Sequence, residues 1–225
     1  VENFMRQYIE HTSDVRYVTT YILSKAKQRV TLLNLLGPLF AHRVGKDFLV
    51  GTRFISATRH GLVKVCGNLE EILRLMDLSN RYNKRIDQPT WRAIRQSLIS
   101  RPHMDLSPRT SELFLSLLSQ PPHLASLLRR LHELRALEKL VPAVAHARHL
   151  MQFNDYHKYT VDEHSIRAVE AATSFKEMDG PLGEAYAEIR NKRTLHLALL
   201  IHDLGKGFDE DHSEVGRRLA AETAE

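Results

Sequence analysis

The sequence predicts a mainly α-helical fold, in which a helical domain with a small β hairpin or sheet precedes an all-α domain. Three observations support this fold class. Most of the chain places apolar residues at helical spacing, one short stretch is rich in β-prone residues and glycine, and a polar, aromatic run after Met151 leads into new helical patterns. We therefore expect a helical linker domain over residues 1–150 and a second domain over 151–225.

In the first domain, helical spacing over residues 1–36 predicts one or two helices, which Gly37-Pro38 ends. A β segment is expected around 47–66, where β-prone runs lie between glycines: Phe48–Val50, Phe54–Ile55 and Leu62–Val65. Asn68 and Glu71 have capping-box spacing and open the next helix. Together with proline positions, the pattern predicts helices over about 68–80, 89–100, 108–119 and 123–139.

Composition limits the classes of function. The chain has 225 residues, of which 43% are hydrophobic and 26% charged, as in ordinary globular proteins. Its net charge of +5 is mildly basic without a long Lys/Arg run, so we expect no nucleic-acid binding. Cys66 is the only cysteine, and no apolar run approaches the roughly 20 residues of a membrane helix. We expect a cytoplasmic protein.

Two predicted helix starts carry a histidine in their first turn. Thr160 and Glu163 have capping-box spacing, which places His164 at the start of a helix. Asp211 and Glu214 repeat this spacing, with His212 as the first helical residue. The helix dipole disfavours a protonated imidazole there, and a metal binds the neutral form.

A third feature is a His-Asp pair at the end of an apolar helix. Residues 194–204 are apolar on nearly every face, which predicts a buried helix that ends at Gly205 as the C′ residue. A buried carboxylate beside an imidazole needs a partner, and a divalent metal would pair with both His202 and Asp203. Lys206 follows closely and can stabilise charge on a phosphate.

The residues alone leave a metal site and a set of structural histidines both open. His157 lies in a loop and His196 is interpreted as a core histidine. Asp162 and Glu163 are expected to serve the helix terminus, with an outer role around a metal as the alternative.

At these residues the chain resembles the HD superfamily of metal-dependent phosphohydrolases. Within that superfamily it looks like the bacterial bifunctional uridylyltransferase/uridylyl-removing enzyme family, which modifies the PII signal protein of nitrogen regulation. The likeness is near-continuous from Met151 to His164 and continues in His202–Gly207 and Asp211–Glu214. Looser likeness extends upstream, to the start of the chain, to 48–65 and to the helical stretch 131–142.

The resemblance implies a metal held by His164, His202 and Asp203, with His212 as a further ligand and Lys206 near the phosphate. His202, Asp203 and Lys206 would then be the catalytic residues, removing UMP from uridylylated PII. The ligand types suit Mn²⁺, Mg²⁺, Fe²⁺ or Zn²⁺. The chain starts and stops within helical patterns, so we expect a fragment whose last aspartate ligand lies beyond residue 225.

Three alternatives remain. The first is an HD phosphohydrolase that acts on a nucleotide. The second is a non-catalytic HD module that binds a regulator or transmits a conformational signal. The third is a helical interaction domain in which the histidines are structural. Metal analysis separates the third alternative from the other two.

Overall fold

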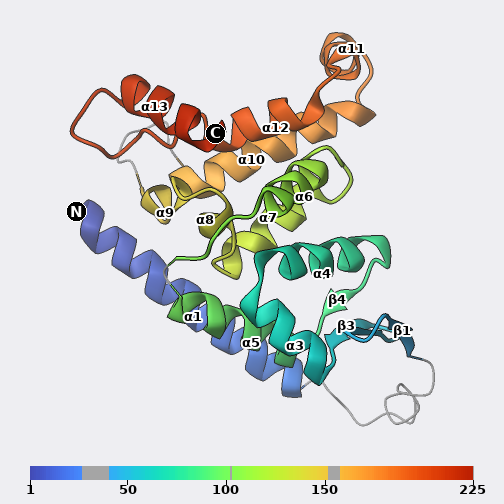
Figure 1. The fold of residues 1–225 in the computed structure, drawn as a ribbon. Coiled ribbons are helices and arrows are strands. Elements are labelled where there is room, and N and C mark those ends of the chain that lie inside the picture. The colour runs from blue at the N-terminus through green and yellow to red at the C-terminus, as the bar shows by residue number, and fades with distance from the viewer. Residues whose placement is uncertain (27–40, 102, 152–157, 225) are drawn as a thin grey trace. The chain divides into compact units, whose positions relative to one another are not determined.

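The computed structural model describes residues 1–26, 41–101, 103–151 and 158–224 (Figure 1). It confirms a mainly helical fold with one small sheet. The chain divides into two compact units, which we call the first unit, His11–Thr110, and the second unit, Val1–Glu10 with Ser111–Glu225. The domain division predicted at residue 150 stays a prediction. None of the helices in the described ranges is both long and apolar enough to cross a membrane.

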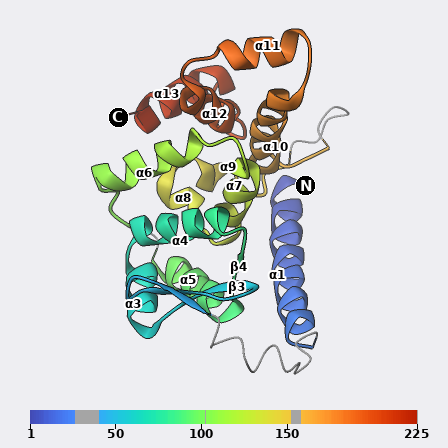
Figure 2. The same ribbon diagram turned by 90° about the vertical axis from the view of Figure 1, so that its right-hand side faces the viewer.

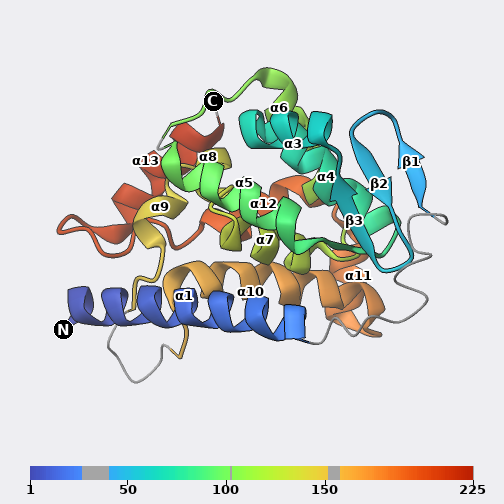
Figure 3. The ribbon, with the colours of Figure 1, turned by 90° about the horizontal axis from the view of Figure 1, so that it is seen from below.

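The first unit contains a four-stranded sheet in the order β1-β2-β3-β4. Its strands are β1 His42–Val44, β2 Phe48–Val50, β3 Phe54–Ala57 and β4 Arg85–Ile86. The first three are antiparallel neighbours (Figure 3), and β4 runs parallel to β3. Phe48, Val50 and Ile55 are buried, which fits the period-two pattern of a sheet with one face in the core. The predicted β segment is therefore confirmed over 48–57.

The β prediction was wrong for Leu62–Val65, which lies in helix α3, Arg59–Gly67. The Thr58 side chain accepts a hydrogen bond from the Gly61 amide (3.1 Å) and so caps this helix. Gly61 and Val65 are buried one helical turn apart, whereas Val63 is 74% exposed. A strand would have buried Val63 and Val65 on the same face, so the β-branched residues misled the prediction.

The other helices of the first unit agree with the sequence. They are α1 Glu2–Ala26, whose first residues belong to the second unit, α4 Leu69–Arg81 and α5 Gln88–Ser100. Asn68 caps α4 by accepting from the Glu70 amide (2.8 Å), and Asp87 caps α5 by accepting from the Thr90 amide (3.1 Å). Residues 27–36 of the predicted helical stretch lie outside the described residues.

In its described residues the second unit contains helices and no strand. Its elements are α6 Pro108–Leu118, which begins at the end of the first unit, α7 Leu124–Glu133, α8 Leu137–Leu140, α9 Val144–Ala147, α10 Val161–Ser174, η2 Phe175–Glu177, α11 Pro181–Glu188, α12 Lys192–Ile201 and α13 His212–Ala224. Helix α10 packs against both α7 and α12 (Figure 2). The single helix predicted over 123–139 is divided, because Arg135 adopts a left-handed conformation (φ 69°) between α7 and α8.

Candidate metal centre

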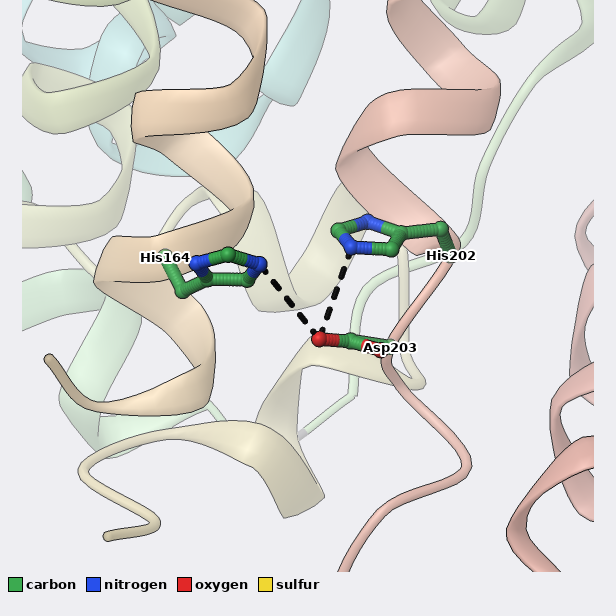
Figure 4. A group of neighbouring side chains, drawn as sticks. All are labelled: His164, His202 and Asp203. Atoms are coloured by element: carbon green, nitrogen blue, oxygen red, sulfur yellow. Dashed lines mark ion pairs between the residues drawn. The ribbon is translucent and has the colours of Figure 1, made fainter. Parts of the chain in front are cut away.

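Three side chains of the second unit converge at the junction of α10 and α12. His164 comes from the first turn of α10, and His202 and Asp203 directly follow α12 (Figure 4). Asp203 Oδ2 lies 3.5 Å from His164 Nε2 and 3.4 Å from His202 Nε2. One ligand atom from each residue lies within 4.8 Å of the others, a spacing that a single metal ion can bridge. We call these three residues the metal cluster.

His164 occupies the predicted place, but the predicted capping box does not form. Thr160 is the N-cap residue of α10, yet its side chain makes no cap hydrogen bond. Glu163 turns instead to the guanidinium groups of Arg167 (2.8 Å) and Arg129 (3.3 Å). The His164 amide donates to the Thr160 carbonyl (2.8 Å), so His164 is fixed by the backbone of the first helical turn.

The ring of His202 is oriented by the end of its own helix. Its Nδ1 lies 2.8 Å from the Leu199 carbonyl oxygen, which can only accept a hydrogen bond. Nδ1 therefore donates to this carbonyl oxygen, and Nε2 is the ring nitrogen that faces Asp203. A histidine that donates through one ring nitrogen to a backbone carbonyl presents the other nitrogen to a metal.

The turn after Asp203 depends on a glycine, for a different reason than predicted. Gly205 was expected to end the helix as a C′ residue, but His202 is the C-cap and the positive φ (82°) belongs to Gly207. A Cβ atom at Gly205 would lie 2.1 Å from the His212 carbonyl oxygen and 2.5 Å from the Gly216 amide nitrogen. Gly205 is thus required because the turn touches the backbone of α13.

Helix α12 is less buried than its sequence predicted. His196 and Leu200 are buried, but Ala198 is exposed. The apolar residues Leu195 and Leu199 line an open cavity of about 370 Å³ between α10, α11 and α12. The predicted burial is confirmed for the face of His196 and Leu200 and wrong for the opposite face, because composition does not reveal which apolar faces find a packing partner.

The metal cluster is open on its histidine side. The side chains of His164 and His202 are 42% and 38% exposed, whereas that of Asp203 is 16% exposed. Lys206 Nζ lies 2.7 Å from Asp203 Oδ2, which brings the predicted Lys206 into the site. Burial raises the pKa of Asp203, but the hydrogen bond from Lys206 and the nearby His202 lower it further, so the pKa falls below its ordinary value. Asp203 is therefore ionised and can act as a carboxylate ligand.

His212 is placed differently. It is the first residue of α13, as predicted, and Asp211 caps that helix by accepting from the amides of Ser213 (3.0 Å) and Glu214 (3.2 Å). His212 is exposed and lies outside the metal cluster, so its role as a further ligand stays a prediction.

His196 and His157 are the two remaining histidines of the motif region, and the structure describes His196. His196 is fully buried, with Nδ1 2.6 Å from the Leu118 carbonyl oxygen and Nε2 3.0 Å from the Tyr186 hydroxyl, in agreement with a core histidine. His157 lies outside the described residues.

A second aspartate–histidine group is not predicted by the sequence. Asp162, expected to serve the helix terminus with an outer role around a metal as the alternative, is 3% exposed and bonded to His132 (2.8 Å) on α7. The signal in the sequence is weak, because His132 sits in a leucine-rich helix 30 residues earlier. A histidine on an amphipathic helix is ordinarily interpreted as a surface residue.

The comparison with known proteins agrees with the metal cluster. No solved structure matches the chain. Residues 161–225 match the HD domain family, and His164, His202 and Asp203 all lie within the matched segment. HD domains bind divalent metals and are typically metal-dependent phosphohydrolases. The donor set found here, two imidazole nitrogens and one carboxylate oxygen, fits such an ion. The match over residues 161–225 supports an HD domain in this part of the chain and is consistent with the HD superfamily of metal-dependent phosphohydrolases.

Proposed function

We propose that this HD domain removes UMP from a uridylylated PII signal protein by metal-dependent hydrolysis of a phosphodiester. The observation that carries the hydrolytic part is the metal cluster inside the HD match. The substrate is inferred from the resemblance of Met151–His164 to the uridylyl-removing enzymes. The exposed edges of His164 and His202 support a macromolecular substrate, because a modified side chain on a protein surface can reach them without entering a deep pocket.

Each residue has a role that follows from its surroundings. His164 Nε2, His202 Nε2 and Asp203 Oδ2 would hold Mn²⁺, Mg²⁺, Fe²⁺ or Zn²⁺. When bound, such an ion acts as a Lewis acid that withdraws charge from a phosphoryl oxygen and lowers the pKa of water. Leu199 keeps the His202 ring oriented through its carbonyl oxygen. Lys206 can turn from Asp203 to a phosphate oxygen and stabilise the charge that develops there.

The test compares UMP release from uridylylated PII by the protein that carries this sequence and by its His202→Ala and Asp203→Ala variants. We expect both variants to lose release and Mn²⁺ binding while the fold is kept. His60→Ala is the matched control, because His60 also pairs with an aspartate, Asp47 (2.6 Å), but lies in the first unit. We expect that variant to release UMP at the wild-type rate.

A panel of nucleotides in the same assay decides the alternatives. Hydrolysis of a nucleotide without release of UMP from PII would overturn the proposed substrate and leave an HD nucleotide phosphohydrolase. Mn²⁺ binding that depends on His202 without any hydrolysis would indicate a regulatory HD module. Undiminished UMP release by His202→Ala would exclude the metal cluster as the reacting site.

A further inference from the structure

A buried carboxylate stands at the start of the helix that carries His164. Asp162 is the second residue of α10 and only 3% exposed. Its Oδ2 atom accepts hydrogen bonds from His132 Nε2 (2.8 Å) and from the backbone amide of His149 (3.0 Å). Its Oδ1 atom lies 2.9 Å from the amide of Glu163. We call His132, His149 and Asp162 the buried cluster.

A helix start does not need a buried carboxylate. Asp211 caps α13 with an exposed side chain and two backbone amides, which suffices to satisfy the first turn. Capping alone does not explain Asp162, because the free-energy cost of removing its carboxylate from water is offset only by several fixed hydrogen-bond donors. The additional donors belong to segments outside α10: His132 on α7 and His149 in the turn after α9.

These donors hold the first turn of α10 from separate directions. His149 has a left-handed backbone (φ 56°), which directs its amide at Asp162. The next residue, Leu150, accepts a backbone hydrogen bond from Val161 (2.9 Å). His132 ties the same turn to α7. The first turn of α10 is therefore fixed in both position and rotation, and His164 extends from that turn.

A second link between α7 and α10 lies further along the helix. Arg129 on α7 makes two short contacts with Glu170 (2.8 and 2.6 Å). The contact with Glu170 holds α7 against α10 beyond His164. Arg129 also reaches Glu163 in the first turn (3.3 Å), so a substitution at Glu170 removes the distant contact and keeps the near one. The two links thus separate helix packing in general from placement of His164 in particular.

We propose that Asp162 is a positioning residue, which acts through the first turn of α10 to hold the His164 imidazole where it and Asp203 can share one divalent cation. This inference rests on the proposed metal-dependent function. It assigns the buried cluster to the placement of a ligand, in addition to the stability that it gives the fold.

The test compares Asp162→Asn with Glu170→Gln in the full chain, using Co²⁺ alone as the probe. Both substitutions remove one carboxylate charge that links α7 to α10 and keep the side-chain size. We expect Asp162→Asn to weaken Co²⁺ binding by about tenfold and to change its visible absorption spectrum, as outer-shell substitutions at metal sites do. Glu170→Gln should leave affinity and spectrum unchanged. His132→Gln, which keeps a donor, should shift affinity in the same direction by less and serves if Asp162→Asn does not fold.

Hydrogen exchange of the His164 amide without metal is the second readout. Asp162→Asn should speed this exchange, and Glu170→Gln should not. Equal losses in the two variants, or wild-type affinity and exchange in Asp162→Asn, would overturn the inference. If the wild-type chain binds no Co²⁺, the proposed metal function fails, and exchange at His164 alone decides the positioning role: faster exchange in Asp162→Asn supports it and unchanged exchange refutes it.

Discussion

The metal cluster and the buried cluster use the same residue types, one aspartate and two histidines, in opposite surroundings. Asp162 is 3% exposed, and fixed donors lie 2.8 and 3.0 Å from its Oδ2 atom. Asp203 instead has two imidazole nitrogens at 3.4 and 3.5 Å, longer than an ordinary hydrogen bond, on an exposed side of the domain. The short hydrogen bonds to Asp162 satisfy its carboxylate and make it structural. The longer distances from Asp203 to the two imidazole nitrogens leave room for a cation between them.

The largest effect should come from Asp203→Asn. Asparagine keeps the shape but removes the charge that holds the cation, so we expect hydrolysis to fall by at least about 100-fold. The free energy of unfolding should fall by only about 1 kcal/mol, because asparagine keeps the shape and an oxygen that Lys206 can still reach. Initial-rate assays and thermal unfolding measure the two quantities. A variant that unfolds readily but hydrolyses normally would reverse the roles assigned to the two aspartates.

Asp162→Ala should show the opposite balance. It leaves the His132 ring and the His149 amide without their acceptor in a buried place, so we expect a loss of about 3 kcal/mol in unfolding free energy. Urea denaturation followed by circular dichroism measures this loss. Asp211→Ala is the matched control, since Asp211 also accepts from two backbone amides but is exposed, and it should cost clearly less stability than Asp162→Ala.

Acid should destabilise the fold through the buried cluster. Burial lowers the pKa of His149 to about 4, and the neighbouring Arg148 lowers it too. In the unfolded chain His149 is protonated near pH 6.5, whereas in the folded chain it is protonated only near pH 4. The free energy of unfolding therefore falls as the pH drops from 6.5 to 4. The full effect is about 3 kcal/mol. Asp162 does not contribute there, because its pKa lies below its ordinary value of 3.8: burial raises it, but the bond from His132 lowers it further.

The variant His149→Asn isolates this effect. Asparagine tolerates the left-handed backbone and does not titrate, so the loss of stability between pH 6.5 and 4 should become smaller. Part of the loss should remain, because burial also lowers the pKa of His196. Unfolding free energies at several pH values test this. An unchanged slope in His149→Asn would show that His149 is not the group that titrates.

The two clusters also differ in how far the sequence predicts them. His164, His202 and Asp203 were found because each stands at a helix end, where local spacing and capping residues carry the signal. The buried cluster joins residues 30 apart, and its formation depends on the packing of α7 against α10. Spacing along one helix contains no information about such a contact.

Errors in the fold prediction have the same origin. The run Leu62–Val65 has β-branched residues, but the Thr58 cap and the contact of Gly61 with the Asp47 backbone make it a helix. A Cβ atom at Gly61 would lie 2.0 Å from the Asp47 carbonyl oxygen, a constraint that only the folded chain imposes. Tertiary contacts thus overruled local propensity in both regions of the molecule.

The smallest effects expected here, about threefold in Mn²⁺ affinity and about tenfold in rate, concern Lys206 and refine the comparison. The short contact of Asp162 comes from an imidazole held in a helix, whereas that of Asp203 comes from a lysine on a flexible stem, at 2.7 Å. The Lys206 ammonium at Asp203 Oδ2 repels a metal cation that binds the same oxygen. Lys206→Met should therefore tighten Mn²⁺ binding about threefold, while hydrolysis slows by about tenfold because the phosphate loses its cation. Calorimetric titration and initial rates measure the two changes, which should have opposite signs. If Lys206→Met weakens Mn²⁺ binding instead, the lysine helps to build the site, and Asp203 resembles Asp162 in needing a fixed partner.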